Sequence, residues 1–176
     1  MKQKIRNEVR MRISTMTLEE RAAVSVDVCR KVIASPEWIA AENVLLYMAL
    51  PDEVSLSILI SDASGVGKKV WLPVIVGNEL VVRQYDGVNL RQESRFGVSE
   101  PTEDAPEIAT LADLDLAIIP GRAFTREGLR LGRGKGFYDR LLPQLHCPLW
   151  GVGFPCQLVD TLPVDDWDVP MMRVIA

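Results

Sequence analysis

Apolar positions near the N-terminus recur at helical spacing. Ile5, Val9 and Ile13 lie four residues apart, which predicts an amphipathic helix over residues 2–14. Residues at this spacing share one face of a helix, so the cations of the segment line up on a second face. That cationic face consists of Lys2, Arg6 and Arg10.

Capping signals predict further helices. Thr17 followed by Glu20 forms a capping box, which begins a helix that runs to about Ala34. Ser35 and Pro36 start a short helix, because serine suits the N-cap and proline suits the first turn. A helical pattern also covers residues 54–61.

Short, nearly continuous apolar runs predict strands that are buried on both faces. The predicted strands cover residues 43–49, 69–75, 79–85, 114–120, 149–154 and 173–176. Strands that alternate with helices favour an α/β fold with a largely parallel sheet, and the hairpin around Gly77 makes the sheet mixed. We expect residues 86–111 to be mostly irregular, as a functional loop or a surface wrap. Since no repeat or linker divides the chain, we expect a single domain over residues 1–176.

Composition narrows the class of protein. A net charge of -4 argues against a broad nucleic-acid surface, although a local basic pocket remains compatible with it. Three cysteines without a CxxC pair favour reduced thiols over a zinc site or disulfides. The only histidine, His146, lies in no catalytic motif, and we interpret it as structural. No signal-peptide core or bilayer-length apolar run occurs, so we expect a cytoplasmic protein without a membrane partner.

Residues 130–139, RLGRGKGFYD, carry the clearest chemical signal. Three glycines alternate with Arg133 and Lys135 between a predicted strand and a helix expected from about Lys135 to Leu145. Glycines let backbone N–H groups approach a ligand and form an anion-binding nest, and a helix start adds partial positive charge. The two cations offset the charge of a polyphosphate, and Asp139 can hold its Mg²⁺ through oxygen.

The segment differs from two common phosphate-binding motifs. It is not a Walker A loop, because Gly136 follows Lys135 where serine or threonine should stand. It is not a GxGxxG fingerprint either, because its glycines alternate strictly. A flexible loop with solvated charges is the remaining alternative.

The segment RLGRGKGFYDR resembles the signature of the 5-formyltetrahydrofolate cyclo-ligase family, also called methenyltetrahydrofolate synthetase. Other motifs agree with that family in order along essentially the whole chain. They are KQKIR at 2–6, YMALPDEV at 47–54, FGVSEP at 96–101, DLAIIPGRAF at 115–124, GFPCQLV at 153–159 and LPVDDWD at 162–168. Several separate motifs in one order are more specific than a single glycine loop.

The resemblance implies a three-layer α/β domain related to sugar-phosphate isomerase and CoA-transferase folds. It also implies an ATP- and Mg²⁺-dependent ligase that converts 5-formyltetrahydrofolate to 5,10-methenyltetrahydrofolate, ADP and phosphate. The formyl oxygen takes the γ-phosphoryl group, N10 attacks the activated carbon, and phosphate departs. No covalent nucleophile is needed, so the protein contributes positioning and charge stabilisation. The implied partners are the small-molecule substrates reduced folate and ATP. The expected assembly is a monomer or a weak homo-oligomer.

The resemblance further implies roles for individual residues. Arg133 and Lys135 would be catalytic, stabilising the phosphoryl group in transfer, and Asp139 and Asp168 would hold Mg²⁺. Met48 and Glu53 would bind the folate, with the Glu53 carboxylate accepting from the donor edge of the pterin. The ATP-binding residues would be Lys2, Arg6, Arg130, Leu131, Gly132, Arg133, Gly134, Lys135, Gly136, Phe137 and Tyr138.

Simpler interpretations stay open for several of these positions. Lys2 and Arg6 could simply form a solvated basic face of the helix. Asp168 could simply belong to a solvated acidic turn. Each of three aromatic residues is a candidate either for stacking on the folate or for packing in the hydrophobic core: Trp71, Tyr85 and Phe96. The chain departs from the family pattern at Trp167, where histidine is usual, and at Met172, where a second acidic residue is often found. The alternative functions are another ATP-dependent activating enzyme and a non-catalytic nucleotide-binding module.

Overall fold

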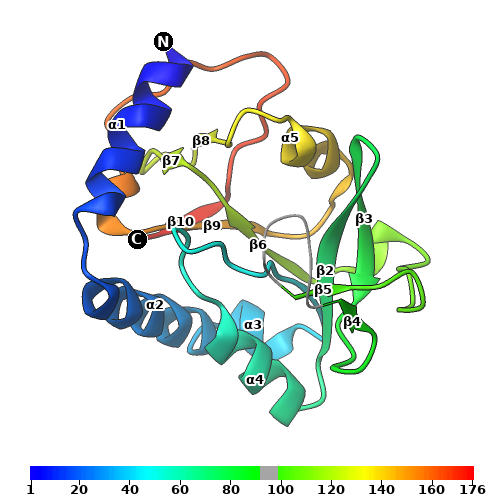
Figure 1. Cartoon of the computed structure of the whole chain (residues 1–176). Helices are drawn as coiled ribbons and strands as arrows, with labels where there is room; N and C mark the ends of the chain where they lie inside the picture. The colour runs from blue at the N-terminus through cyan, green and yellow to red at the C-terminus, as the bar shows by residue number, and fades with distance from the viewer. Residues whose placement is uncertain (92–98) are drawn as a thin grey trace.

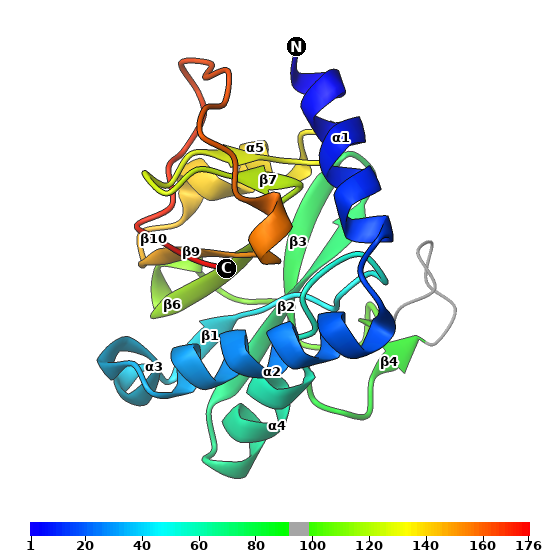
Figure 2. The same ribbon diagram turned by 90° about the vertical axis from the view of Figure 1, so that its left-hand side faces the viewer.

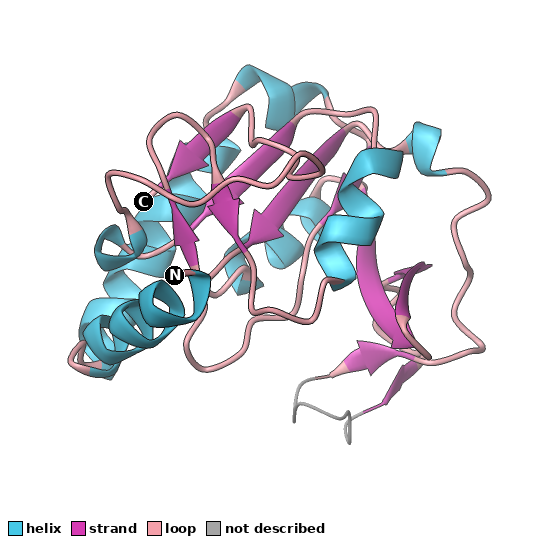
Figure 3. Cartoon of the chain, turned by 90° about the horizontal axis from the view of Figure 1, so that it is seen from above, coloured by secondary structure: helices cyan, strands magenta, loops and turns pink. Residues whose placement is uncertain are grey.

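A six-stranded sheet forms the centre of the computed structural model, which describes residues 1–91 and 99–176. Its strands are β1 (Asn43–Leu45), β2 (Lys69–Val76), β3 (Glu79–Gln84), β6 (Leu116–Pro120), β9 (Leu149–Val152) and β10 (Arg173–Ile175). They lie in the order β10-β9-β6-β1-β2-β3, side by side in Figure 3. All neighbours pair in parallel except β2 and β3, which form the expected hairpin. The predicted α/β class with a mixed, largely parallel sheet is confirmed.

Helices cover both faces of the sheet. They are α1 (Lys2–Ser14), α2 (Leu18–Ile33), α3 (Pro36–Ala40), α4 (Ser57–Gly65) and α5 (Phe137–Leu141). In Figure 1, α2, α3 and α4 lie on one side of the sheet and α5 lies on the other. Figure 2 shows α2 running along the sheet, whereas α1 stands at its side and contacts β7 (Ala123–Phe124). The result is the expected three-layer arrangement.

Side chains of the central strands alternate between two buried clusters. In β6, Leu116 and Ile118 belong to the cluster that includes α1, α2 and α4 residues. Ala117 and Ile119 belong to the cluster that includes Leu141 from α5. Because successive strand residues point to opposite faces and both faces are covered, every position must be apolar. This explains the continuous apolar run from which the strand was predicted.

The first three predicted helices are confirmed by their caps or their buried face. The Thr17 hydroxyl accepts from the N–H of Glu20 at 3.1 Å, and the Glu20 carboxylate accepts from the N–H of Thr17 at 2.7 Å. The Ser35 hydroxyl likewise accepts from the N–H of Trp38 at 3.2 Å. On α1, Val9 and Ile13 are buried, as the spacing predicted.

The other predicted helices were displaced. The helix expected over residues 54–61 begins at Ser57, because the preceding Leu56 has φ of -99° and ψ of 14°, outside the helical range. The helix expected from Lys135 begins at Phe137, since Gly136 has a left-handed φ of 70° outside the helical range. It passes at Leu141 into a 3-10 turn, Leu142–Gln144, in which proline has no N–H to donate.

Strand boundaries also differ from the prediction. The strand expected over residues 43–49 ends at Leu45, where the chain turns into a loop closed by Tyr47 and Val54. The strand expected over residues 114–120 begins only at Leu116, and the strand expected over residues 149–154 ends at Val152. The elements that were not predicted are β4 (Leu90–Arg91), β5 (Glu100–Pro101), β7 (Ala123–Phe124), β8 (Arg130–Leu131) and the 3-10 turns Leu111–Asp113 and Pro155–Gln157. Among the helices of the described residues, none has the length and apolar character needed to cross a bilayer.

The order of the strands reverses between β1 and β6. From β1 the chain continues to β2 on one side, whereas β6 lies on the other side. The loops that leave the carboxyl ends of β1 and β6 therefore diverge and open a crevice, which is where ligands bind in α/β sheets of this kind. The topology thus places the expected site after Leu45 and Pro120.

Close packing around the Phe124 ring predicts that Gly151 resists substitution. A Cβ at Gly151 in β9 would lie 2.5 Å from Phe124 Cε1 and 3.1 Å from Met171 Cγ. Gly151→Ala should therefore lower the free energy of unfolding by ~1–3 kcal/mol, measured by urea unfolding. The control is Gly65→Ala in α4, where a Cβ meets nothing within 4 Å and stability should hold or rise slightly. Equal stability of the two variants would contradict this packing.

Candidate functional site

A cavity of about 400 Å³ opens at the crevice between β1 and β6. Such a volume suits a drug-sized ligand. Its walls come from the segment after β1, the β2–β3 hairpin, residues 100–101, the segment after β6 and residues 130–139. The hairpin contributes an apolar wall, whereas the segments after β1 and β6 and the glycine-rich segment contribute charged groups. The cavity therefore combines an apolar surface with a few convergent charges.

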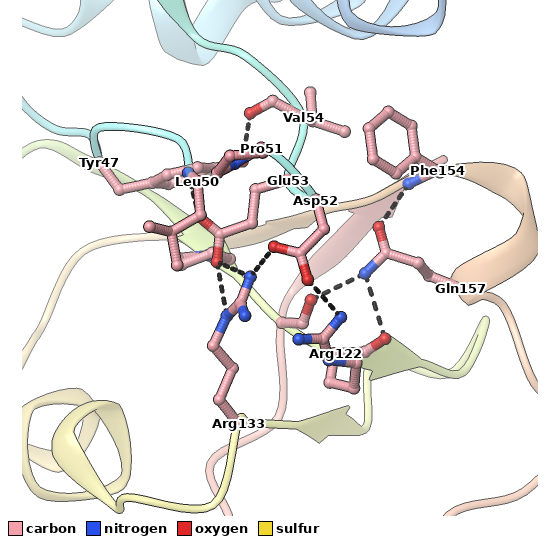
Figure 4. Close-up of polar contacts among 12 residues, drawn as sticks. Tyr47, Leu50, Pro51, Asp52, Glu53, Val54, Arg122, Arg133, Phe154 and Gln157 are labelled. Carbon is pink, nitrogen blue, oxygen red and sulfur yellow. Dashed lines mark hydrogen bonds and ion pairs between the residues drawn. The ribbon is translucent and has the colours of Figure 1, made fainter. Parts of the chain in front are cut away.

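The loop after β1 is held at several points (Figure 4). The Tyr47 hydroxyl donates to the Val54 carbonyl at 2.8 Å, which closes the loop. Within it, the N–H of Leu50 donates to Glu53 Oε2 at 2.9 Å. Arg21 of α2 donates to the Pro51 carbonyl at 3.1 Å. These bonds fix the backbone that presents Glu53 to the cavity and Asp52 to Arg122 and Arg133.

Arg133 of the glycine-rich segment reaches across to this loop. Its Nε donates to Glu53 Oε1 at 2.9 Å, and its Nη2 donates to Asp52 Oδ1 at 2.5 Å. Asp52 Oδ2 also accepts from Arg122 Nη1 at 2.8 Å. Burial alone raises the pKa of Asp52, but Arg133 and Arg122 outweigh it and hold the pKa below its ordinary value. For Arg133, burial lowers the pKa, and the two carboxylates more than compensate.

The glycine-rich segment also contacts the N-terminal helix. Gly134 and Gly136 have φ values of 98° and 70°, in the left-handed region that favours glycine. Arg6 of α1 donates from Nε to the Gly132 carbonyl at 2.8 Å, and its guanidinium packs against Gly134. The cationic face of α1 is therefore directed at the loop through Arg6.

Lys2, one turn earlier on α1, contacts the acidic segment near the C-terminus. Its ammonium donates to Asp165 at 2.6 Å and to Asp168 at 3.1 Å. Burial lowers the pKa of Lys2, but the two aspartates outweigh it, so that the pKa is raised. Three segments far apart in the sequence thus meet around residues 130–139, while Arg10, the third cation of that face, is exposed.

Arg130 and Asp139 both line the cavity and contact each other. The Arg130 guanidinium is buried, donates to Asp139 at 3.2 Å and to the Pro120 carbonyl at 2.8 Å, and lies over the Tyr138 ring at 5.1 Å. Burial lowers the pKa of Arg130, and the charges of Asp139 and Asp168 act in the opposite direction. Both carboxylates therefore influence the same cation.

Asp139 and Asp168 suit Mg²⁺ by the chemistry of their oxygens. Within residues 1–91 and 99–176, no group of three His, Cys, Asp or Glu side chains is gathered to hold a metal. Magnesium usually takes only one or two carboxylates and completes its shell with water and substrate phosphates. Asp139 lines the cavity, whereas Asp168 lies outside its lining, and Asp168 Oδ2 accepts from Lys2 and from the N–H of Asp165.

Most of the predicted site residues line the cavity, and a few do not. Met48, Glu53, Lys135, Phe137 and Tyr138 line it, together with Arg130, Gly132, Arg133, Gly136 and Asp139. The predicted residues outside the lining are Lys2, Arg6, Leu131, Gly134 and Asp168. The Leu131 side chain packs in the core, so any nucleotide contact there would come from the backbone.

Two of the three aromatic candidates for stacking, Trp71 and Tyr85, do not line the cavity. Trp71 is buried in the core and donates from Nε1 to Asn43 at 3.1 Å, and Tyr85 packs against the core elsewhere. Phe96 lies outside the described residues. Sequence reasoning missed Tyr47, whose place directly after an apolar strand end was the available signal. It also missed Asp52 and Arg122, although these residues lie inside the family motifs at 47–54 and 115–124.

Fold and cavity together define an α/β protein with a cationic glycine-rich loop facing carboxylates at a strand crevice. Residues 1–176 match the 5-formyltetrahydrofolate cyclo-ligase family. The 5-formyltetrahydrofolate cyclo-ligase of Escherichia coli strain K12 is 32% identical over 174 residues, covering 95% of each chain. The chain belongs to this family.

Solved structures agree with the assignment. The NMR structure of 5,10-methenyltetrahydrofolate synthetase from Aquifex aeolicus superposes with a TM-score of 0.87 and 33% identity, covering 98% of this chain and 88% of that one. The synthetase from Mycoplasma pneumoniae gives a TM-score of 0.80 at 20% identity, covering 99% and 97%, and supports the fold alone.

The low pKa of Asp52 predicts a pH-dependent contribution to stability. Its folded-state pKa lies below the ordinary 3.8, so the contribution is fully present above pH 3.8 and is lost as pH falls through the lower value. Asp52→Asn should lower the free energy of unfolding at neutral pH by ~1–3 kcal/mol, and the difference should close in acid. Urea unfolding across this range measures it.

The control for this measurement is Asp27→Asn, which removes an exposed carboxylate paired with Lys31 on α2. Surface pairs contribute little, so this variant should follow the wild type closely at every pH. A stability difference for Asp52→Asn that did not change with pH would contradict the assignment.

Proposed function

We propose that this protein catalyses the ATP-dependent conversion of 5-formyltetrahydrofolate to 5,10-methenyltetrahydrofolate, with release of ADP and phosphate. The observation that carries the proposal is the cavity between β1 and β6, where the cationic loop of residues 130–139 faces Glu53. Membership of the cyclo-ligase family supplies the reaction that suits such a cavity. Its apolar hairpin wall suits a flat ring, and its cations suit phosphates.

The proposed chemistry needs no covalent nucleophile. The formyl oxygen attacks the γ-phosphorus and ADP leaves; N10 then attacks the activated carbon, and phosphate departs from it. Each step develops negative charge on phosphoryl oxygens, so fixed cations lower its barrier. Arg133 and Lys135 lie in the cavity wall and would supply this charge as the catalytic groups.

ATP would lie along the glycine-rich segment. Arg130 and residues 131–138 would surround the nucleotide, with Lys2 and Arg6 reaching its phosphates from α1. The bond from Arg6 to Gly132 supports this, because it holds a cation against the loop. Asp139 and Asp168 would hold Mg²⁺, which neutralises charge on phosphate oxygens when bound.

The folate would occupy the apolar side of the cavity. Glu53 is nearly buried, with 9% of its side chain exposed, so it would accept strongly from the N–H groups of a pterin edge. Met48 lies in the same wall and would pack beside the ring. The fixed loop after β1 supports this role, because Glu53 would need little reordering to bind.

We further propose a single cytoplasmic domain that acts as a monomer or a weak homo-oligomer on small molecules. The net charge of -4 supports small-molecule partners over nucleic acid or a membrane surface. The cations discussed above are concentrated around one cavity rather than along an open face.

The decisive test is turnover of the wild-type protein. Mixed with 5-formyltetrahydrofolate and Mg·ATP, it should produce methenyltetrahydrofolate, followed by near-ultraviolet absorbance. The signal should require ATP and disappear when EDTA replaces Mg²⁺. Binding of ATP without product would instead support another ATP-dependent enzyme or a binding module.

Separate roles for Glu53 and Lys135 give a second prediction. Glu53→Gln keeps the size of the side chain but loses the charge that a pterin edge would meet, so folate affinity should fall by about tenfold to hundredfold. ATP affinity should stay within about threefold of the wild type. Lys135→Met is the contrasting variant: turnover should be lost while folate still binds. Calorimetry with each ligand distinguishes them, and the reverse pattern would overturn both roles.

A further inference from the structure

Asp52 lies between two arginines at the edge of the cavity (Figure 4). One of its oxygens accepts from Arg133 at 2.5 Å and the other accepts from Arg122 at 2.8 Å. We propose that Asp52, anchored by Arg122, is a positioning residue that keeps Arg133 directed at the transferring phosphoryl group when folate engages Glu53. This inference rests on the proposed function and adds two residues that the motifs did not assign.

Arg122 has the properties of an anchor. Only 8% of its side chain is exposed, and its backbone follows β6 directly. Its N–H donates to the Leu131 carbonyl at 2.7 Å, and its carbonyl accepts from Gln157 Nε2 at 3.1 Å. Gln157 is itself buried and accepts from the N–H of Phe154 at 2.7 Å. The guanidinium that holds Asp52 thus starts from a fixed backbone.

Arg133 is less constrained by its own segment. It stands between Gly132 and Gly134, and 35% of its side chain is exposed. Its guanidinium reaches the loop after β1 through Asp52 and Glu53. A long side chain on a glycine-flanked backbone needs such partners to stay in one orientation, because its rotamer freedom opposes ordering.

The proposed pterin contact changes the partners of Arg133. Glu53 Oε1 accepts from Arg133, and Glu53 Oε2 already accepts from the N–H of Leu50. A pterin edge that donates to both oxygens would share Oε1 with Arg133 and so weaken that contact. Asp52 is the carboxylate that stays with Arg133 when that contact weakens.

Sharing one carboxylate between two arginines also preserves the charge that catalysis needs. The cluster also includes Glu53, so its two arginines are balanced by two carboxylates. Without Arg122, Asp52 and Glu53 together would outweigh Arg133, whereas the shared Asp52 leaves more of the Arg133 charge to act on phosphoryl oxygens. Arg122 would therefore act on the reaction through Asp52.

The test is a set of variants under steady-state kinetics. Asp52→Asn should lower kcat by about tenfold to hundredfold, as expected when a catalytic group is misdirected, with KM for folate changed less than about threefold. Arg122→Met should cause a similar loss, and Arg122→Lys should recover part of it. The double variant Asp52→Asn/Arg122→Met should lose no more than Asp52→Asn alone, because the two residues act in one chain.

The matched control is Asp27→Asn, which removes an equivalent carboxylate from an exposed ion pair and should leave kcat unchanged. All assays are run below the melting temperature of each variant, with folding checked by circular dichroism. A kcat for Asp52→Asn within about twofold of the wild type, or additive losses in the double variant, would overturn the proposal.

A measurement without turnover separates this inference from the proposed function. Hydrogen exchange of the Arg133 Nε–H, followed by NMR in the free protein, should speed up in Asp52→Asn and in Arg122→Met but not in Arg122→Lys. Unchanged exchange would overturn the positioning role. An inactive wild type with these exchange changes would instead contradict only the cyclo-ligase reaction.

Discussion

The ion pairs of Arg133 with Asp52 and Glu53 are the constraint on which the site depends. They join the loop after β1 to the glycine-rich segment, eighty-one residues apart between Asp52 and Arg133. Arg122 adds a second link between the two walls, since its guanidinium donates to Asp52 and its N–H donates to the Leu131 carbonyl. Groups with opposite charges on diverging loops hold the crevice in one geometry, which is how a site becomes preorganised.

The fold was largely predictable because its signals are local. In β6 every side chain meets one of two buried layers, so the strand is visible as an uninterrupted apolar run. Element boundaries were less predictable, because tertiary contacts decide them. Ser55 lies in the loop before α4, where its N–H donates to Ser25 of another helix, and no pattern near Ser55 reveals that partner.

The residues of the candidate site also differ in how far the sequence alone reveals them. The glycine-rich loop was found because its alternating glycines and cations form a compact motif, and two of those glycines do adopt left-handed backbone. Asp52 and Arg122 were missed because their meaning depends on a partner seventy residues away. Trp71 was considered for stacking from its residue type alone, and its register in β2 directs it into the core instead.

The charged cluster also explains how a preformed site avoids a large penalty for buried charge. Isolated, the half-buried Arg133 would be costly, and its ion pairs with two carboxylates offset that cost. Under the proposed function, a pterin edge would donate to Glu53 and phosphates would meet Arg133, so each substrate would replace part of this ion pair. Because one ion pair holds both groups, a substrate that weakens it at Glu53 would leave Arg133 more available to the other. Such an exchange is a coupling free energy between the two substrate sites, and it is reciprocal by thermodynamic necessity.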